Sequence, residues 1–134
     1  MRVREAMLTD PRALPATATA QEAAELLVRP EVRAVLVVDG ERLVGLATHA
    51  SLIEHVVAAG RDPRTTPLAE AVEEVGLTIG PDEPVDEAYR RMEEGDVERL
   101  PVTEDGRLVG VLSRKALQLR LAEDEPPDDP AQAG

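Results

Sequence analysis

The sequence repeats itself once along its length, and this repeat constrains the fold more than any other feature. A shift of 65 residues aligns the two halves of the 134-residue chain without a gap. The run Arg-Leu-Val-Gly at 42–45 recurs at 107–110, and Glu-Ala at 22–23 recurs at 87–88. Identities that came from biased composition would be scattered, whereas these fall on matching turns and apolar runs. The sequence therefore predicts two equivalent structural units in tandem.

The first helix of each unit is marked by a start signal. Thr19-Ala-Gln-Glu22 is a capping box, in which a hydroxyl and a carboxylate each bond a free backbone amide at a helix start. We expect this helix to run to about Val28. Pro84 holds the matching place in the second half and suits the first turn of a helix. That helix is expected to run to about Glu94 and to stop at Gly95.

Each first helix is followed by two short apolar runs joined by a turn signal. The runs lie at 34–38 and 43–47 in the first half and at 100–103 and 107–112 in the second. The turn signals between them are Asp39-Gly40 and Asp105-Gly106. Such runs joined by Asp-Gly predict a β-hairpin in each half. Short strands are expected ahead of the first helices, at 13–16 and at 77–79.

A second helix is expected to close each unit. Thr48 and Ser113 stand where the hairpins end, at the position from which a hydroxyl caps the free amides of a following helix. These helices are expected to reach about Ala59 and Ala122. The predicted unit is therefore β-α-β-β-α, and the predicted fold class is α+β.

The sequence divides into two units, a linker and a tail. We expect the first unit over 1–60, the linker over 61–67, the second unit over 68–122 and a disordered acidic tail over 123–134. The tail is rich in Asp, Glu and Pro, so it cannot bury enough apolar surface to order itself.

The charge and residue content exclude several kinds of partner. The net charge of -12 would repel a phosphate backbone or an anionic membrane surface, and Tyr89 is the one aromatic side chain available to stack on bases. No apolar stretch is long enough to span a membrane, and no secretory signal begins the chain. Cysteine is absent, so disulfides and thiolate chemistry are excluded. We therefore expect a cytoplasmic protein that binds neither nucleic acid nor membranes.

Two β-α-β-β-α units in tandem, each with a Gly-hydrophobic-x-Thr/Ser turn after its hairpin, resemble a pair of CBS domains, also called a Bateman module. The run Arg99-Leu-Pro-Val102 in the second unit adds to the resemblance, which covers about 3–122. It implies that the two units pack sheet to sheet about a pseudo-twofold axis. It also implies two clefts, which in many members of the family bind adenosyl ligands such as AMP, ATP or S-adenosylmethionine.

The family's binding signature ends in an aspartate that this chain lacks. The signature is Gly-hydrophobic-x-Thr/Ser-x-x-Asp, in which the hydroxyl and the helix start meet the phosphate and the aspartate holds the ribose diol. The matching runs here are Gly45 to Ser51 and Gly110 to Ala116. With Ser or Ala in place of Asp, a ribose loses a charge-assisted contact worth about 1.5–3 kcal/mol at each site.

The resemblance implies candidate ligand-binding residues in both units. They are Thr78, Pro81, Arg99, Leu100, Pro101, Ser113 and Arg114 in the second unit, and Thr48, His49 and Ser51 in the first. The second unit is the expected anion site because its hydroxyl has more basic neighbours. The alternative interpretation is that Ser113 only caps a helix and that Arg99 and Arg114 pair with the many acids.

No arrangement of residues indicates catalysis. His49 and His55 are about 240° apart around a helix and do not share a face on which to bind a metal. Ser51 and His55 do share a face, but no orienting acid or oxyanion device accompanies them. We therefore expect no enzyme activity, no metal and no cofactor.

Two functions remain after these exclusions. One is a ligand-sensing regulatory module that binds an adenosyl nucleotide in its clefts. The other is a structural module that dimerises or docks on an unknown protein target, with clefts that have lost their ligand. In both cases the closing helices predict a homodimer, because their apolar residues around 52–57 and 117–121 exceed what one buried face requires.

Overall fold

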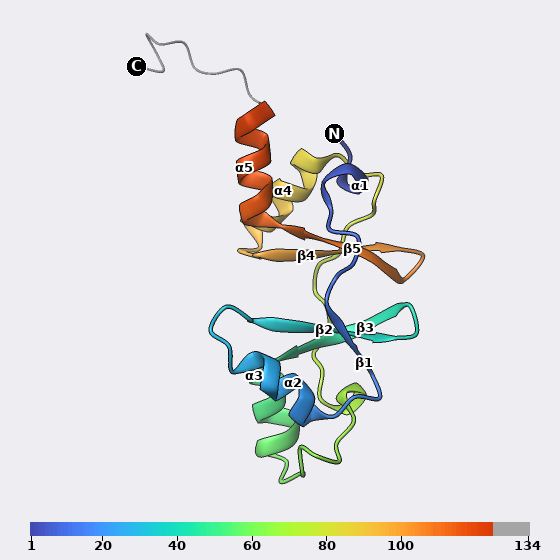
Figure 1. Cartoon of the computed structure of the whole chain (residues 1–134), viewed down its shortest axis with the longest axis vertical. Helices are drawn as coiled ribbons and strands as arrows, with labels where there is room; N and C mark the ends of the chain where they lie inside the picture. Colours follow the sequence, from blue (N-terminus) through green and yellow to red (C-terminus); the bar gives the residue numbers. More distant parts are fainter. Residues whose placement is uncertain (125–134) are drawn as a thin grey trace.

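The structure is a computed structural model that describes residues 1–124 (Figure 1). Its helices are α1 (Val3–Ala6), α2 (Ala20–Leu27), α3 (His49–Leu52), α4 (Val85–Glu94) and α5 (Arg114–Asp124), with a π-helical turn η1 (Ile53–Val57) and a 3-10 turn η2 (Leu68–Glu70). Its strands are β1 (Ala13–Pro15), β2 (Ala34–Asp39), β3 (Arg42–Thr48), β4 (Arg99–Glu104) and β5 (Arg107–Ser113). Helix α5 includes Glu123 and Asp124, and the rest of the expected tail, 125–134, lies outside the described residues.

The first helix of each unit forms where its start signal predicted it. The Thr19 hydroxyl accepts the Glu22 amide at 3.2 Å, and the Glu22 carboxylate accepts the Thr19 amide at 3.4 Å. Helix α4 starts after Pro84 and ends at Gly95. The capping box and the helix stop are both confirmed.

The closing helix of the first unit differs from the expectation of one α-helix to Ala59. The single α-helical turn α3 passes into η1, where the amide of Ala58 bonds the carbonyl of Ile53 at 2.7 Å. β-Branched side chains crowd the preceding turn of an α-helix, and Ile53, Val56 and Val57 are all in η1. Within this wider turn Val56 is buried, whereas Ile53 and Val57 are exposed.

Both predicted hairpins form, each with a two-residue turn. In the first, Asp39 pairs with Arg42, so the turn is Gly40-Glu41 and lies one residue later than predicted. Gly40 has φ 64°, and a left-handed glycine at the first turn position is what a type II′ turn requires. The second turn is Asp105-Gly106, as predicted, and its φ angles of 55° and 82° match a type I′ turn.

The strand expected at 77–79 is reduced to one bridge between Ile79 and Val102. The amide of Ile79 bonds the carbonyl of Pro101 at 3.1 Å, and the carbonyl of Ile79 accepts the amide of Thr103 at 2.9 Å. The prediction of a strand equivalent to β1 is therefore wrong for the second unit.

Two prolines explain why this ladder stops at one residue. A parallel ladder continues only if further amides are present on either side of the bridge, and here those positions are Pro81 and Pro101, which have none. The matching residues of the first unit are Ala16 and Leu36, which do have amides. Ala16 bonds the carbonyl of Val38 at 2.7 Å, and β1 pairs with β2 along its whole length.

The two sheets face each other at the centre of the molecule, and the helices cover their outer faces (Figure 1). Helices α2 and α3 lie at one end, and α4 and α5 at the other. The sheets join through Arg42 of β3 opposite Arg107 of β5, which gives the strand order β1-β2-β3-β5-β4. The predicted sheet-to-sheet packing is confirmed.

Matched backbone bonds show the pseudo-twofold relation between the units. The amide of Leu43 bonds the carbonyl of Gly106 at 3.2 Å, and the amide of Leu108 bonds the carbonyl of Glu41 at 2.8 Å. Each of these bonds becomes the other when its residue numbers are shifted by 65.

The opening segments of the two units change places. Residues 1–8 pack against the second unit, and residues 66–73 pack against the first. Val3 is therefore buried in the core of the second unit, and its match Leu68 is buried in the core of the first. The units in space thus differ from the units in sequence.

Each unit has a core of aliphatic side chains, as a chain without Phe or Trp requires. The first core contains Ala18, Ala23, Leu27, Val35, Val37, Ala47 and Leu68. The second contains Val3, Ile79, Val85, Ala88, Met92, Leu100, Val102, Leu112 and Leu117, with Tyr89 at its edge. Over residues 1–124, every helix is too short or too polar to cross a membrane.

Candidate functional site

The turn between β3 and α3 closes on itself through reciprocal hydrogen bonds. The Thr48 hydroxyl accepts the Ser51 amide at 3.0 Å, and the Ser51 hydroxyl accepts the Thr48 amide at 2.8 Å. The Ser51 hydroxyl also donates to the Thr48 carbonyl at 3.1 Å, and Ser51 is only 1% exposed. Ser51 is therefore a buried cap, and the structure does not place it where a ligand can reach it.

The glycine of each turn motif allows an exchanged segment to approach β3 or β5. A Cβ added at Gly45 would lie 2.8 Å from the Cβ of Val72, and one added at Gly110 would lie 2.6 Å from the sulfur of Met7. Beside Gly45, Leu46 and Glu73 exchange backbone bonds of 2.9 and 2.8 Å. The glycines therefore serve the packing of the exchanged segments.

Glu73 brings a carboxylate to the turn that sequence analysis did not foresee. The Thr48 hydroxyl donates to the Glu73 carboxylate at 2.8 Å. Residue 73 is distant in sequence, and only the exchange of segments places it beside β3. The sequence signal for this carboxylate was a difference between the repeats: Glu73 stands at the position where the first half has the apolar Leu8.

A cleft of about 380 Å³ opens beside Thr48 in the first unit. It is lined by Pro30, Val32, Arg33, Thr48, His49 and Ala50. The His49 ring donates its Nε2 proton to the Leu27 carbonyl at 2.8 Å, since a carbonyl can only accept. Arg33 is exposed and, within residues 1–124, makes no ion pair.

The corresponding turn of the second unit is neutralised by acids. The Ser113 hydroxyl accepts the Ala116 amide at 3.3 Å, as a cap does. Arg114 bonds the Asp96 carboxylate at 3.1 Å and lies 3.7 Å from the Glu98 carboxylate. The hydrogen bond that Arg114 donates to the Asp96 carboxylate raises the pKa of Arg114. For Ser113 and Arg114 the geometry is that of the alternative interpretation, a cap and an ion pair.

The other predicted residues of the second unit are divided between core and surface. Leu100 is fully buried in the core and cannot offer its side chain to a ligand. Pro101 and Pro81 are buried, and their carbonyls accept the amides of Ile79 and Arg4. Arg99 is exposed at the start of β4.

Thr78 lies at a different place from the rest of the predicted set. It lines a cleft of about 340 Å³ between the hairpin tips, together with Leu43, Val44, Glu74, Val75, Thr103 and Gly106. The predicted residues therefore do not form one site. Thr48 and His49 share the cleft of the first unit, Thr78 lies in the cleft between the units, and Ser113 and Arg114 form the neutralised turn.

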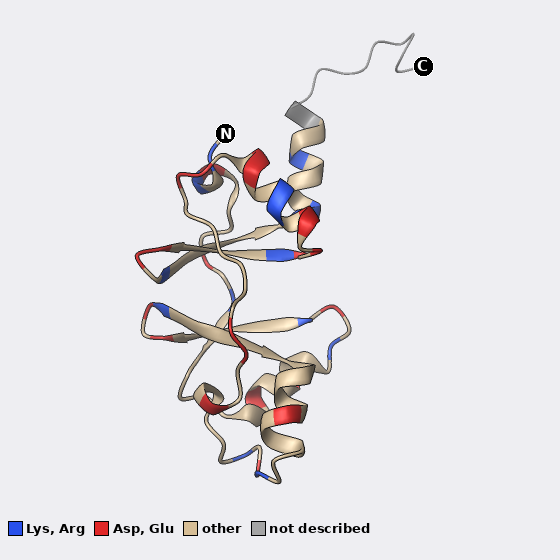
Figure 2. Ribbon diagram, turned by 180° about the vertical axis from the view of Figure 1, so that it is seen from behind, with Lys and Arg blue, Asp and Glu red and all other residues tan. Residues whose placement is uncertain are grey.

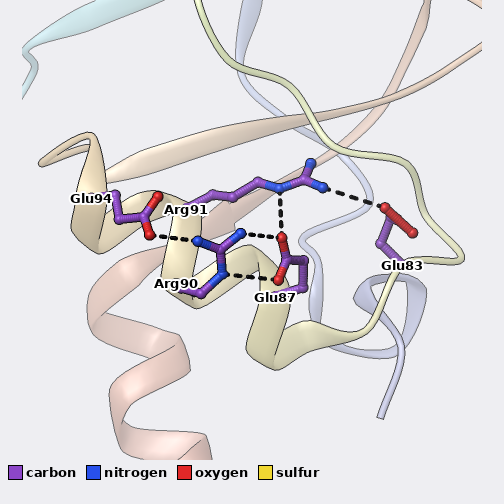
Figure 3. Close-up of polar contacts among 5 residues, drawn as sticks. All are labelled: Glu83, Glu87, Arg90, Arg91 and Glu94. Atoms are coloured by element: carbon purple, nitrogen blue, oxygen red, sulfur yellow. Dashed lines mark hydrogen bonds and ion pairs between the residues drawn. The ribbon is translucent and has the colours of Figure 1, made fainter.

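The largest group of ion pairs lies on α4 and is away from these clefts. Arg90 bonds Glu87 and Glu94, and Arg91 bonds Glu87 at 3.1 Å and approaches Glu83 at 3.6 Å (Figure 3). The two arginines lower the pKa of Glu87 to about 2. Figure 2 shows charged residues of both signs along this helix and at the hairpin tips. These pairs are exposed, so they act on the helix surface rather than in a site.

The described residues hold no group of three or more His, Cys, Asp or Glu side chains that is arranged to bind a metal ion. Among the residues that line the cleft beside Thr48, Arg33 offers a guanidinium, which can bind an anionic group through charge and hydrogen bonds. The Thr48 hydroxyl donates its proton to Glu73, which is not a lining residue of the cleft.

Comparison with known proteins agrees with the fold. A model of the CBS domain matches residues 3–58 and 72–123. The CBS domain-containing protein YhcV of Bacillus subtilis is 29% identical over 111 residues, which are 83% of this chain and 79% of YhcV. The Vibrio cholerae protein AcuB superposes with a TM-score of 0.77 at 24% identity, covering 95% of this chain and 98% of AcuB. CBSX2 in complex with AMP superposes with a TM-score of 0.71 at 21% identity, covering 92% and 98%.

Proposed function

This chain belongs to the CBS domain family, and we propose that it is a regulatory module whose ligand is an adenosyl nucleotide. The fold similarity to CBSX2, whose structure holds AMP, supports this ligand class. Both runs that match the family's binding signature lack its aspartate, so the proposal rests on the geometry of the cleft rather than on the signature.

The observation that carries the proposal is the guanidinium of Arg33, which lines the cleft beside Thr48 and makes no ion pair with the described residues, 1–124. A cation that makes no ion pair among residues 1–124, in a cleft of about 380 Å³, suits a phosphate group. In the second unit the residue that matches Arg33 is Glu98, and it lies beside Arg114. We therefore assign the phosphate to the first unit, although the sequence favoured the second.

Calorimetric titration with AMP tests the proposal. Removing a charge-assisted contact in Arg33→Ala should weaken AMP binding by about ten- to a hundredfold, which corresponds to about 1.5–3 kcal/mol. Arg99→Ala removes an exposed arginine from the start of β4 and is the matched control, expected to bind AMP as the wild type does. Adenosine, which lacks the phosphate, should bind both variants equally.

A thermal-shift screen of AMP, ATP and S-adenosylmethionine should precede the titration. A ligand at a hundred times its dissociation constant stabilises the native state by about 2.7 kcal/mol. No stabilisation by any of the three at millimolar concentration would contradict the proposal. Equal loss of AMP affinity in Arg33→Ala and Arg99→Ala would contradict the assignment to the first unit.

A second function, self-association, is favoured by one observation. Ile53, Val57 and Leu119 are 59%, 71% and 62% exposed, and all three lie on the closing helical segments of the units. We propose that these exposed apolar side chains, at the two opposite ends of the molecule, form the homodimer predicted from the sequence. Light scattering of Ile53→Asp/Val57→Asp should show the mass of one 14.4 kDa chain, whereas the wild type and Val28→Asp, at an exposed site on the end of α2, should show twice that mass.

A further inference from the structure

We infer that two copies of this chain associate side by side and antiparallel, so that η1 of each copy contacts α5 of the other. The inference rests on the proposed self-association, and it adds the orientation of the second copy and the charged residues that select this orientation. The first unit of one copy thus lies against the second unit of the other.

The exposed apolar side chains of the closing helical segments lie at opposite ends of the molecule. Ile53 and Val57 are on η1 of the first unit, and Leu119 is on α5 of the second. Figure 1 shows α5 above the two sheets and α3, which leads into η1, below them, both toward the left of the view. Two copies that lie side by side can therefore bury all three side chains, with their long axes either parallel or antiparallel.

The helical segments α2, α3 and η1 of the first unit carry acids and no arginine or lysine. Their acids are Glu22, Glu25 and Glu54. The side chain of Glu54 is 76% exposed, and among residues 1–124 its one ion-pair contact is His55 at 4.0 Å, which is a pair only when the ring is protonated. Glu54 therefore places a negative charge next to the exposed Ile53.

The closing helix of the second unit carries the opposite charge around its exposed apolar side chain. Between 114 and 122, α5 has three basic residues and no acid. Arg114 is bound by Asp96, whereas Lys115 and Arg120 are exposed and make no ion pair in the described range, 1–124. Lys115 lies one helical turn before Leu119, and Arg120 directly follows Leu119. Leu119 is therefore flanked by two positive charges.

The neighbouring helix α4 does not offer a competing apolar contact. Within residues 1–124, every large apolar side chain that is exposed lies on another element. The two arginines of α4 are bound by Glu83, Glu87 and Glu94. The cations that accompany exposed apolar surface in the second unit are thus those of α5.

Charge decides between the parallel and the antiparallel arrangement. In a parallel dimer η1 would meet η1, so Glu54 would face a second Glu54, and Lys115 would face a second Lys115. In an antiparallel dimer Glu54 faces the cations around Leu119 of the second copy, and the twofold axis repeats this contact. Opposite charges across an interface favour an arrangement, and like charges disfavour it. The antiparallel dimer therefore satisfies both the apolar side chains and the charges.

Cysteine cross-linking reads the orientation directly, because the chain has no cysteine of its own. Val57→Cys and Leu119→Cys are each treated with a short bismaleimide at micromolar concentration, alone and as an equimolar mixture. The mixture should give a species of twice the 14.4 kDa chain mass, and each variant alone should not. Val28→Cys, at the exposed end of α2, is the matched control and should not cross-link to Leu119→Cys.

Charge reversal gives a second readout. In the antiparallel dimer Glu54→Lys turns an attraction into a repulsion at two exposed contacts, so the dissociation constant should rise by about two- to thirtyfold. In a parallel dimer a Glu-Glu contact would become a Lys-Lys contact, and the dissociation constant would not change. Adding Lys115→Glu and Arg120→Glu to Glu54→Lys should restore the affinity. Glu31→Lys makes the same change of net charge in the loop before β2 and should not weaken the dimer.

The failure of the orientation and the failure of self-association give different results. Cross-linking of either cysteine variant alone, or a dissociation constant of Glu54→Lys equal to that of the wild type, would overturn the antiparallel arrangement while the dimer stands. A dimer that cross-links in no mixture would place these helices outside the interface. Light scattering that shows the mass of one chain for the wild type would contradict the proposed self-association and the inference with it. Circular dichroism checks that each variant is folded.

Discussion

The turn that precedes the closing helix has the same backbone in both units but different side chains around it. In the first unit Thr48 bonds the Glu73 carboxylate, and its cleft is lined by Arg33, which makes no ion pair within the described part of the chain, 1–124. In the second unit Ser113 has Leu8 in place of the carboxylate, and Arg114 is held by Asp96 and Glu98. The scaffold is thus common, and a few substitutions on it decide which unit offers a site.

The same contrast holds on the first helices. α4 carries two arginines that bind three glutamates, whereas α2 has Glu25 and Leu26 at the matching positions. The two arginines of α4 are therefore paired on the surface of their own helix, whereas Arg33 of the first unit makes no ion pair among residues 1–124. Duplication followed by different use of charge accounts for both differences.

The largest effect on stability should come from a core substitution in one of the two opening segments that pack against the opposite unit. Leu68 belongs to the second unit by sequence and to the core of the first unit in space, where it is fully buried. Leu68→Ala should lower the free energy of unfolding by about 2–5 kcal/mol, because it removes buried carbons and leaves a cavity. Hydrogen exchange should show the loss of protection first in α2 and β2.

Val3→Ala is the matched variant of the other core. Val3 is equally buried and packs among residues of the second unit, so its loss of protection should lie in α4 and β4. The effect should be smaller than that of Leu68→Ala because fewer carbons are removed. Faster hydrogen exchange of the α2 amides in Val3→Ala would show that the opening segments do not pack against the opposite units.

This exchange marks the limit of what the repeat could predict. A 65-residue shift shows that the halves are alike, and it places turns and caps correctly, as at Thr19 and Asp105. It does not show which half each opening segment packs against, because Val3 and Leu68 are apolar at matching positions and suit either core. The contact of Glu73 with Thr48 depends on that choice and so was not predicted.

The next largest effect on stability should be a difference between substitutions at Gly45 and at Gly110, the glycines of the two turn motifs. An added Cβ approaches a backbone carbonyl at both glycines, that of Glu73 at 2.9 Å from Gly45 and that of Leu8 at 2.8 Å from Gly110. At Gly45 it also meets the Cβ of Val72, which cannot move away, whereas at Gly110 it meets the flexible side chain of Met7. Gly45→Ala should therefore destabilise by about 1–3 kcal/mol, as overpacking does, and Gly110→Ala by less. Chemical denaturation measures both. Equal losses would indicate that the backbone carbonyls nearby, and not the side chains, set the cost.

Two of the predicted site residues have surroundings in the structure, of charge and of burial, that a sequence pattern does not contain. Arg114 follows the Ser113 hydroxyl in the sequence, but in the structure it forms ion pairs with Asp96 and Glu98 from the loop before β4. Leu100 stood in a family motif, but alternation along β4 turns it into the core. Arg33 lines the cleft of the first unit and makes no ion pair among residues 1–124.

A smaller effect on stability should come from making the one-residue bridge at Ile79 more like the parallel pairing of β1 with β2. Pro101→Leu introduces the residue that the first unit has at position 36 and restores an amide that can donate to the carbonyl of Leu77. We expect a protected amide at residue 101 and a net gain of no more than about 1 kcal/mol. The added hydrogen bond is offset in part by the greater freedom of the unfolded chain without proline. A rapidly exchanging amide at residue 101 would show that proline is not what stops the ladder.

The smallest effect should appear when α4 loses the centre of its ion pairs. The folded pKa of Glu87 is about 2, below its ordinary value of 4.5, because Arg90 and Arg91 bind the ionised form. A depressed folded pKa stabilises the protein above the unfolded pKa, and this contribution is lost as the pH falls from about 4.5 towards 2. Glu87→Gln should therefore flatten the acid limb of the stability curve over that interval, with a small change at pH 7 because the pairs are exposed to solvent. Glu22→Gln, at the matching position of α2, keeps a side-chain oxygen that can accept the Thr19 amide and replaces a carboxylate that has no arginine partner among residues 1–124, so stability at pH 7 should change little. An acid limb that flattens equally in both variants would show that the arginines of α4 do not distinguish the two helices.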